Sequence, residues 1–71
     1  MDSYTFYKGR IMSAPSYGFI AGHEILEIVS RCAQNDSTLT KSQIINIITL
    51  CTEAHKFMME ENFRNGWTAD K

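Results

Sequence analysis

The sequence predicts a small α+β domain: an N-terminal β-hairpin over residues 3–20, then an antiparallel pair of helices over 22–34 and 41–65. Two observations lead to this prediction. Aromatic and β-branched residues crowd the first twenty positions, a composition typical of strands. Apolar residues then recur at intervals of three and four along the two later segments, which is the pattern of amphipathic helices. The chain has 71 residues, so we expect a single domain with a small core.

The predicted hairpin has a first strand over residues 3–12 and a short second strand over 17–20. Pro15 lies between them, where its fixed φ and missing N–H donor favour a turn. A two-stranded ribbon is marginal in water, so we expect it to pack on the helices or pair with another chain. A purely helical hairpin with an irregular N-terminal arm is the alternative fold.

The first helix is predicted from an apolar stripe with helical spacing. Its members are Ile25, Ile28, Val29 and Cys32. Arg31 lies near the C-terminal end, where a cation interacts favourably with the helix dipole. The polar residues 35–37 then break the pattern, so we expect a short connection and antiparallel neighbours.

The second helix begins with a capping box, in which Thr40 is the N-cap residue and Gln43 reaches back to it. Gly66 suits the position just after the C-terminus. Residues 68–71 are predicted to form a frayed tail. The helix is clearly longer than its predicted partner, so the apolar face of its second half must pack against some other surface.

That surplus apolar surface predicts a protein interface, either with a second copy of the chain or with another protein. Stability favours association in a chain this short. The alternative is that the hairpin folds over this end and buries it. The predicted interface residues are Ile45, Leu50, Phe57, Met58, Met59, Phe63 and Trp67.

Composition excludes some classes of protein and indicates others. The formal net charge is −1, which argues against dominant electrostatic binding to nucleic acid or anionic lipid. No apolar run approaches the roughly 18 residues that a membrane-spanning helix needs. The first residues do not form a signal peptide. We therefore expect a cytoplasmic protein whose two cysteines are reduced.

An antiparallel register of the helices places residue 23 opposite residue 53. His23 then approaches Cys51 and His55, and Glu27 lies one turn after His23. Zinc accepts such ligands, but no complete zinc motif is present, so we predict no metal and no cofactor. Cys51 and His55 could also form a nucleophile and its base. Burial raises the pKa of a thiol and makes it inert, so we expect no enzyme.

The same register separates Cys32 from Cys51 by more than one helical turn, which is too far for a disulfide. We expect both to be small buried apolar residues.

The hairpin offers a second candidate surface, in which cations alternate with aromatic rings. Its residues are Tyr4, Tyr7, Lys8, Arg10 and Tyr17. Such a mixture can stack bases and bind phosphates, so the alternative function is a nucleic-acid-binding regulator. The other interpretation is that these rings form the core face of the hairpin.

The function that we expect is non-enzymatic. The chain is predicted to bind another protein as a small regulator, adaptor or inhibitor, of the kind that phages and mobile elements carry. We expect it to act as a homodimer through the long C-terminal helix.

Overall fold

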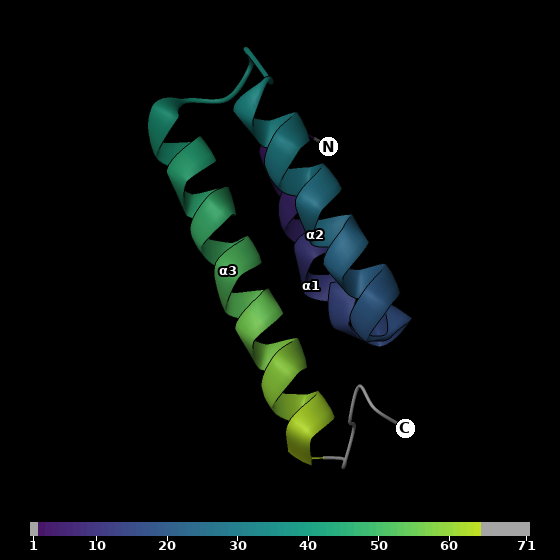
Figure 1. Ribbon diagram of the computed structural model, residues 1–71. Helices are drawn as coiled ribbons and strands as arrows, with labels where there is room; N and C mark the ends of the chain where they lie inside the picture. The colour runs from purple at the N-terminus through teal and green to yellow at the C-terminus, as the bar shows by residue number, and fades with distance from the viewer. Residues whose placement is uncertain (1, 65–71) are drawn as a thin grey trace.

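A computed structural model describes residues 2–64, and it folds this part of the chain entirely from helices (Figure 1). Helix α1 covers Ser3–Ser13, α2 covers Phe19–Gln34 and α3 covers Lys41–Arg64, and the short 3₁₀ helix η1 covers Ala14–Tyr17. Helix α2 runs antiparallel to both α1 and α3 (Figure 1). Every pair of these helices is in contact, so the fold is a three-helix bundle.

The predicted α+β fold and its N-terminal hairpin are therefore wrong, because the segment 3–13 is helical. Asp2 caps this helix by accepting the backbone N–H of Thr5 at 2.7 Å. Tyr4, Tyr7 and Ile11 then lie on one helical face against the core. The high aromatic content indicated a strand, but the same residues also have helical spacing. Burial on the other two helices decides between the two patterns.

Pro15 lies in η1 and not in a hairpin turn. Gly18 follows with φ +88°, a conformation that favours glycine, and redirects the chain into α2. The predicted second strand at 17–20 is thus a turn and the beginning of a helix. Helix α2 begins at Phe19, three residues before the predicted start at residue 22.

The core lies along the axis of the bundle and draws on all three helices and η1. Its buried apolar residues are Ile11, Ala14, Leu26, Val29, Ala33, Ile47, Cys51 and Met58. Gly22 marks the closest approach, because a Cβ there would lie 2.5 Å from the Ala14 carbonyl oxygen and 2.7 Å from Met58 Sδ. Part of the predicted overhang of α3 is therefore covered by the end of α1 and η1.

The buried face of α2 differs from the predicted stripe. The structure buries Gly22, Leu26, Val29 and Ala33, whereas Ile28 and Cys32 are exposed. The prediction that Cys32 is buried is wrong. The reason is that Gly22, Leu26, Val29 and Ala33 follow one another at intervals of four, three and four residues, so they share the helical face that packs on the other helices.

The connection between α2 and α3 is held by side chains of the loop. The capping box is confirmed: the Thr40 N–H donates to Gln43 Oε1 at 2.9 Å, and the Gln43 N–H donates to Thr40 Oγ1 at 3.1 Å. Asp36 accepts the Tyr7 hydroxyl at 2.9 Å, which ties the loop to α1. The loop therefore sets both the start of α3 and the position of α1.

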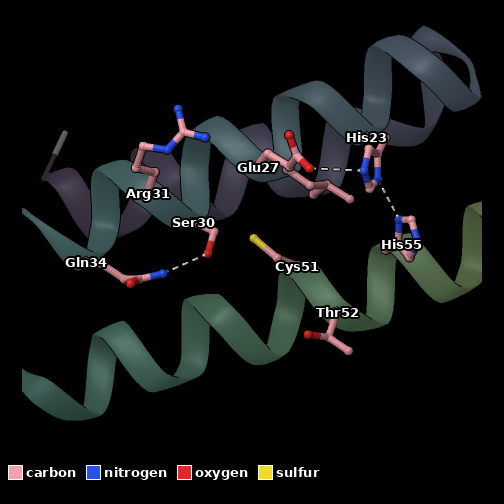
Figure 2. Close-up of a pocket in the computed structure, with 9 residues that line it drawn as sticks. His23, Glu27, Ser30, Arg31, Gln34, Cys51, Thr52 and His55 are labelled. Atoms are coloured by element: carbon pink, nitrogen blue, oxygen red, sulfur yellow. Dashed lines mark hydrogen bonds and ion pairs between the residues drawn. The ribbon is translucent and has the colours of Figure 1, made fainter.

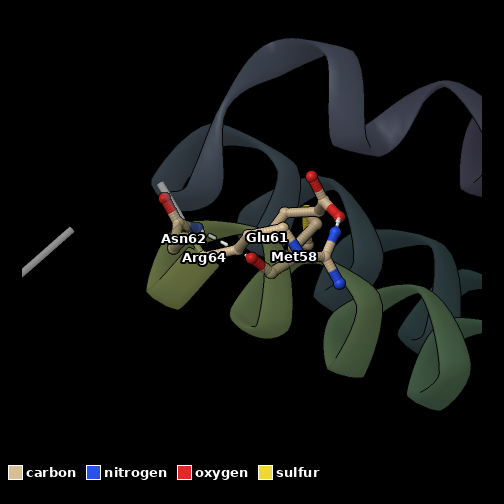
Figure 3. Close-up of polar contacts among 4 residues, drawn as sticks. All are labelled: Met58, Glu61, Asn62 and Arg64. Carbon is tan, nitrogen blue, oxygen red and sulfur yellow. Dashed lines mark hydrogen bonds and ion pairs between the residues drawn. The ribbon is translucent and has the colours of Figure 1, made fainter. Parts of the chain in front are cut away.

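Helix α3 is close to its predicted extent, 41–65, and is described as far as Arg64. Polar groups near its end are satisfied within the helix: Asn62 Nδ2 donates to the Met58 carbonyl oxygen at 2.9 Å, and Arg64 pairs with Glu61 (Figure 3). The predictions for Gly66 and for the tail at 68–71 lie outside the described residues. Of the helices within residues 2–64, none has the length and apolar character that crossing a membrane requires.

Candidate functional site

A pocket of about 520 Å³ lies between α2 and α3 (Figure 2). The buried side chain of Leu26 contributes apolar surface to its lining. The polar side chains in it are His23, Glu27, Ser30, Arg31, Gln34, Thr52 and His55, together with the Cys51 thiol. The pocket thus contains the residues that the antiparallel register had predicted to meet.

The two histidines of the chain form a contact across this pocket. His23 Nδ1 lies 2.9 Å from His55 Nδ1, and His23 Nε2 lies 3.2 Å from Glu27 Oε1 (Figure 2). The ring of Phe19 stacks on His23 at 6.3 Å and is tilted against His55 at 6.2 Å. The predicted proximity of His23 and His55 is confirmed.

The hydrogen-bonding capacities of these groups determine the proton positions in the neutral pair. The Glu27 carboxylate only accepts, so His23 donates from Nε2. A neutral imidazole carries one N–H, so Nδ1 of His23 accepts and His55 donates from its own Nδ1. Adding a proton to both rings would point two N–H donors at each other.

Cys51 lines the same pocket but is buried, and burial raises the pKa of its thiol. The neutral thiol is a poor nucleophile and a poor metal ligand. Cys32 and Cys51 are both free, as the register predicted.

Three or more metal-binding side chains do not converge anywhere in residues 2–64. Glu27 approaches the nitrogen of His23 that faces away from His55, so its oxygen does not share a centre with the two Nδ1 atoms. The predicted cluster of His23, Glu27, Cys51 and His55 therefore yields a histidine pair supported by a carboxylate.

The predicted interface residues of α3 divide into groups. Ile45, Met59 and Phe63 are exposed and share one face by helical spacing, which we call the α3 stripe. Met58 lies in the core and is only 3% exposed. Trp67 lies outside the described residues.

Leu50 and Phe57 lie on the other edge of α3, in a groove of about 390 Å³ between α3 and α1. Phe57 is 51% exposed and Met12 lines the same groove. The structure thus places the predicted interface residues on two separate surfaces.

The five predicted hairpin residues do not share one surface. Tyr4 and Tyr7 turn toward the core, where Tyr4 accepts a hydrogen bond from Asn46 and Tyr7 binds Asp36. Lys8 lies over the Tyr4 ring at 5.1 Å. Arg10 and Tyr17 are exposed at different places.

Sequence reasoning missed a groove of about 260 Å³ between α1 and α2, where Phe6 and Arg10 face Ile25, Ile28 and Cys32. Phe6 and Arg10 are four residues apart, so predicting a helix for this segment would have placed them on the same helical face.

Searches against models of known protein families, curated proteins and solved structures found no match for this chain.

Proposed function

We propose that this chain is a non-enzymatic protein that acts by binding protein, and that it forms a homodimer through the α3 stripe. The observation that supports this proposal is the exposure of Ile45, Met59 and Phe63 on one face of the longest helix. Phe63, for example, is 68% exposed. Large apolar side chains on one helix face usually mark a contact surface.

The stripe has the length that a helix-to-helix contact needs. Ile45 and Phe63 are separated by about 27 Å along the helix axis, at about 1.5 Å per residue. Within residues 2–64 the apolar core has eight buried residues, which is a small core, and small chains gain stability by associating. The net charge of −1 causes little repulsion between two copies of the chain, so charge does not oppose a homodimer.

Charge favours an antiparallel arrangement of the two α3 helices. In a parallel pair, Lys56 of one copy would lie against Lys56 of the other, and the two positive charges would repel. An antiparallel pair centred between Thr52 and Lys56 instead sets each lysine beside a threonine and packs Ile45 against Phe63 of the other copy. Both ends of the interface are then apolar, and the helix dipoles oppose each other favourably.

The dimer would act in the cytoplasm as a small regulator, adaptor or inhibitor. Free cysteines are compatible with a reducing compartment. The nucleic-acid alternative depended on a basic aromatic hairpin. That segment is α1, in which Tyr4 and Tyr7 pack against the core, so it does not present a basic aromatic hairpin.

Sedimentation equilibrium over a range of concentrations tests the dimer. We expect a reversible dimer for the unmodified chain, and Ile45→Ser or Phe63→Ser should each weaken it by about 10-fold or more, as truncation of a central contact residue does. The two substitutions should act alike, because the antiparallel arrangement brings these residues together.

Phe57→Ser is the matched control, since it removes an exposed phenylalanine from the opposite edge of the same helix. It should leave the dimer intact. A chain that stays monomeric at the highest concentration would refute the proposal, and so would a dimer that only Phe57→Ser dissociates.

A further inference from the structure

We propose that His23 and His55 bind one divalent transition-metal ion, of the Ni²⁺ or Cu²⁺ type, through their two Nδ1 atoms. The site joins α2 to α3 at the mouth of the pocket that separates them, and nothing in the proposed dimer depends on it. Neutral imidazole is the side chain best suited to these ions, whereas Mg²⁺ and Ca²⁺ prefer oxygen ligands.

The distance between the two nitrogens fits adjacent positions around one ion. Imidazole nitrogens lie about 2.0–2.1 Å from such a metal, so two of them at a right angle are about 2.9 Å apart. The observed distance between His23 Nδ1 and His55 Nδ1 is 2.9 Å. Right angles between ligands are the rule in square-planar and octahedral sites, which suit Cu²⁺ and Ni²⁺, whereas tetrahedral zinc needs a wider separation.

Glu27 prepares His23 for this role. By accepting the Nε2 proton at 3.2 Å, the carboxylate leaves the Nδ1 lone pair free to coordinate. A carboxylate behind a coordinating histidine is the usual outer partner of metal-binding imidazoles. For His55 to coordinate as well, its proton moves from Nδ1 to Nε2, which changes no net charge. Both rings then turn from the line of their hydrogen bond so that their Nδ1 lone pairs point at the ion.

The surroundings of the pair provide rigidity and room. Phe19 packs against both rings and limits their rotation. The pocket of about 520 Å³ opens beside them and can hold the water molecules that complete the coordination. Among the other titratable groups that line it, Glu27 is negative, Cys51 is a neutral thiol and Arg31 lies one turn beyond Glu27.

In a site with two imidazole ligands, the metal ion and protons compete for the same two Nδ1 atoms. Both rings must be without a proton at Nδ1 for the ion to bind, because a protonated imidazole nitrogen has no lone pair to donate. Since the two nitrogens come together only in the folded chain, the ion should also stabilise the fold as its concentration rises.

Calorimetric titration of the full chain with NiCl₂, together with melting curves in its presence, tests the proposal. We expect one ion per chain and a melting temperature that rises with Ni²⁺ concentration. His23→Gln and His55→Gln should each abolish both effects. The chain contains only these two histidines, so no other imidazole can substitute for them.

Glu27→Gln and Glu24→Gln form a matched pair of controls. Each removes one negative charge from α2, but only Glu27 contacts His23. Glu27→Gln should weaken binding by about 10- to 100-fold, as the loss of an outer partner does, and Glu24→Gln should leave it unchanged. Cys32→Ser should also bind normally.

Three outcomes would overturn the site: no binding by the unmodified chain, undiminished binding by His55→Gln, or loss of binding in Cys32→Ser. The second would place the ion on a single histidine, and the third would place it on the exposed thiol.

Discussion

The two cysteines illustrate how position alone sets the chemistry of a side chain. Cys51 lies in the core on α3, where burial raises the pKa of its thiol. Cys32 is exposed on α2, where it lines the groove between α1 and α2 together with Phe6. A thiol reacts as the thiolate, so burial should make Cys51 slow to react, whereas Cys32 is open to a reagent.

We therefore expect a thiol reagent at pH 7.5 to modify Cys32 readily and Cys51 slowly. Mass spectrometry of the folded chain should show one fast modification, and Cys32→Ser should remove it. Denaturant should make both sites reactive. Equal rates in the folded chain would contradict the burial of Cys51.

Asp36 joins the loop to α1, and its bonds make stability depend on pH. Hydrogen bonds from the Thr38 hydroxyl and N–H, and then from Tyr7, hold the pKa of the Asp36 carboxyl below its ordinary value. A carboxyl with a lowered pKa in the folded state contributes stability above its unfolded pKa of about 4, and this contribution is lost as pH falls through the folded value.

Asp36→Asn should therefore reduce the loss of stability on acidification below about pH 4. Urea unfolding of the unmodified chain and of Asp36→Asn at pH 6 and pH 3 gives the measurement. If Asp36→Asn and the unmodified chain lose the same stability between pH 6 and pH 3, the Asp36 carboxyl does not contribute to the acid sensitivity of the fold.

At the scale of single elements, α1 shows how two periodic patterns can coexist in one segment. Tyr4, Tyr7 and Ile11 suit a helix that packs on two others, while their aromatic and branched side chains also suit a strand. The N-cap at Asp2 was a local helix signal that the strand prediction did not use. In contrast, the capping box at Thr40 correctly predicted the start of α3, because its hydrogen bonds depend only on nearby residues.

Two glycines within helices should respond in opposite ways to substitution by alanine. Nothing lies within 4 Å of a Cβ at Gly9, so Gly9→Ala should stabilise the chain by about 0.5–1 kcal/mol through helix propensity. A Cβ at Gly22 would meet the Ala14 carbonyl and Met58, so Gly22→Ala should destabilise it by about 1–3 kcal/mol.

Chemical denaturation of the two variants measures this difference. Stabilisation by Gly22→Ala would mean that η1, α2 and α3 do not meet as described.

At the scale of the whole molecule, burial separates residues that look alike in the sequence. Ile45 and Ile47 are two residues apart, on either side of Asn46, yet Ile47 is fully buried and Ile45 is 56% exposed. The partners that make this distinction come from α1 and α2, far away in the chain. The same tertiary packing places Met58 in the core and leaves Phe63 outside.

Ile47→Ala should destabilise the fold by about 2–5 kcal/mol, because it leaves a cavity between the helices. Ile45→Ala should change the stability of the monomer by less than about 0.5 kcal/mol. Thermal or denaturant unfolding at low concentration, where the proposed dimer dissociates, compares them. Similar losses for both would contradict the orientation of α3.

The sequence by itself determined the features that depend on neighbouring residues. It predicted helices near 22–34 and 41–65, the capping box between them and the approach of His23 to His55, since an antiparallel register follows from a short connection. Only the tertiary structure decided that 3–13 is a helix, that Cys32 is exposed and that Ile45, Met59 and Phe63 share an open face. The physical reason is that secondary-structure propensities differ by less than the free energy of burying an apolar side chain, so the packed partners decide where local patterns are ambiguous.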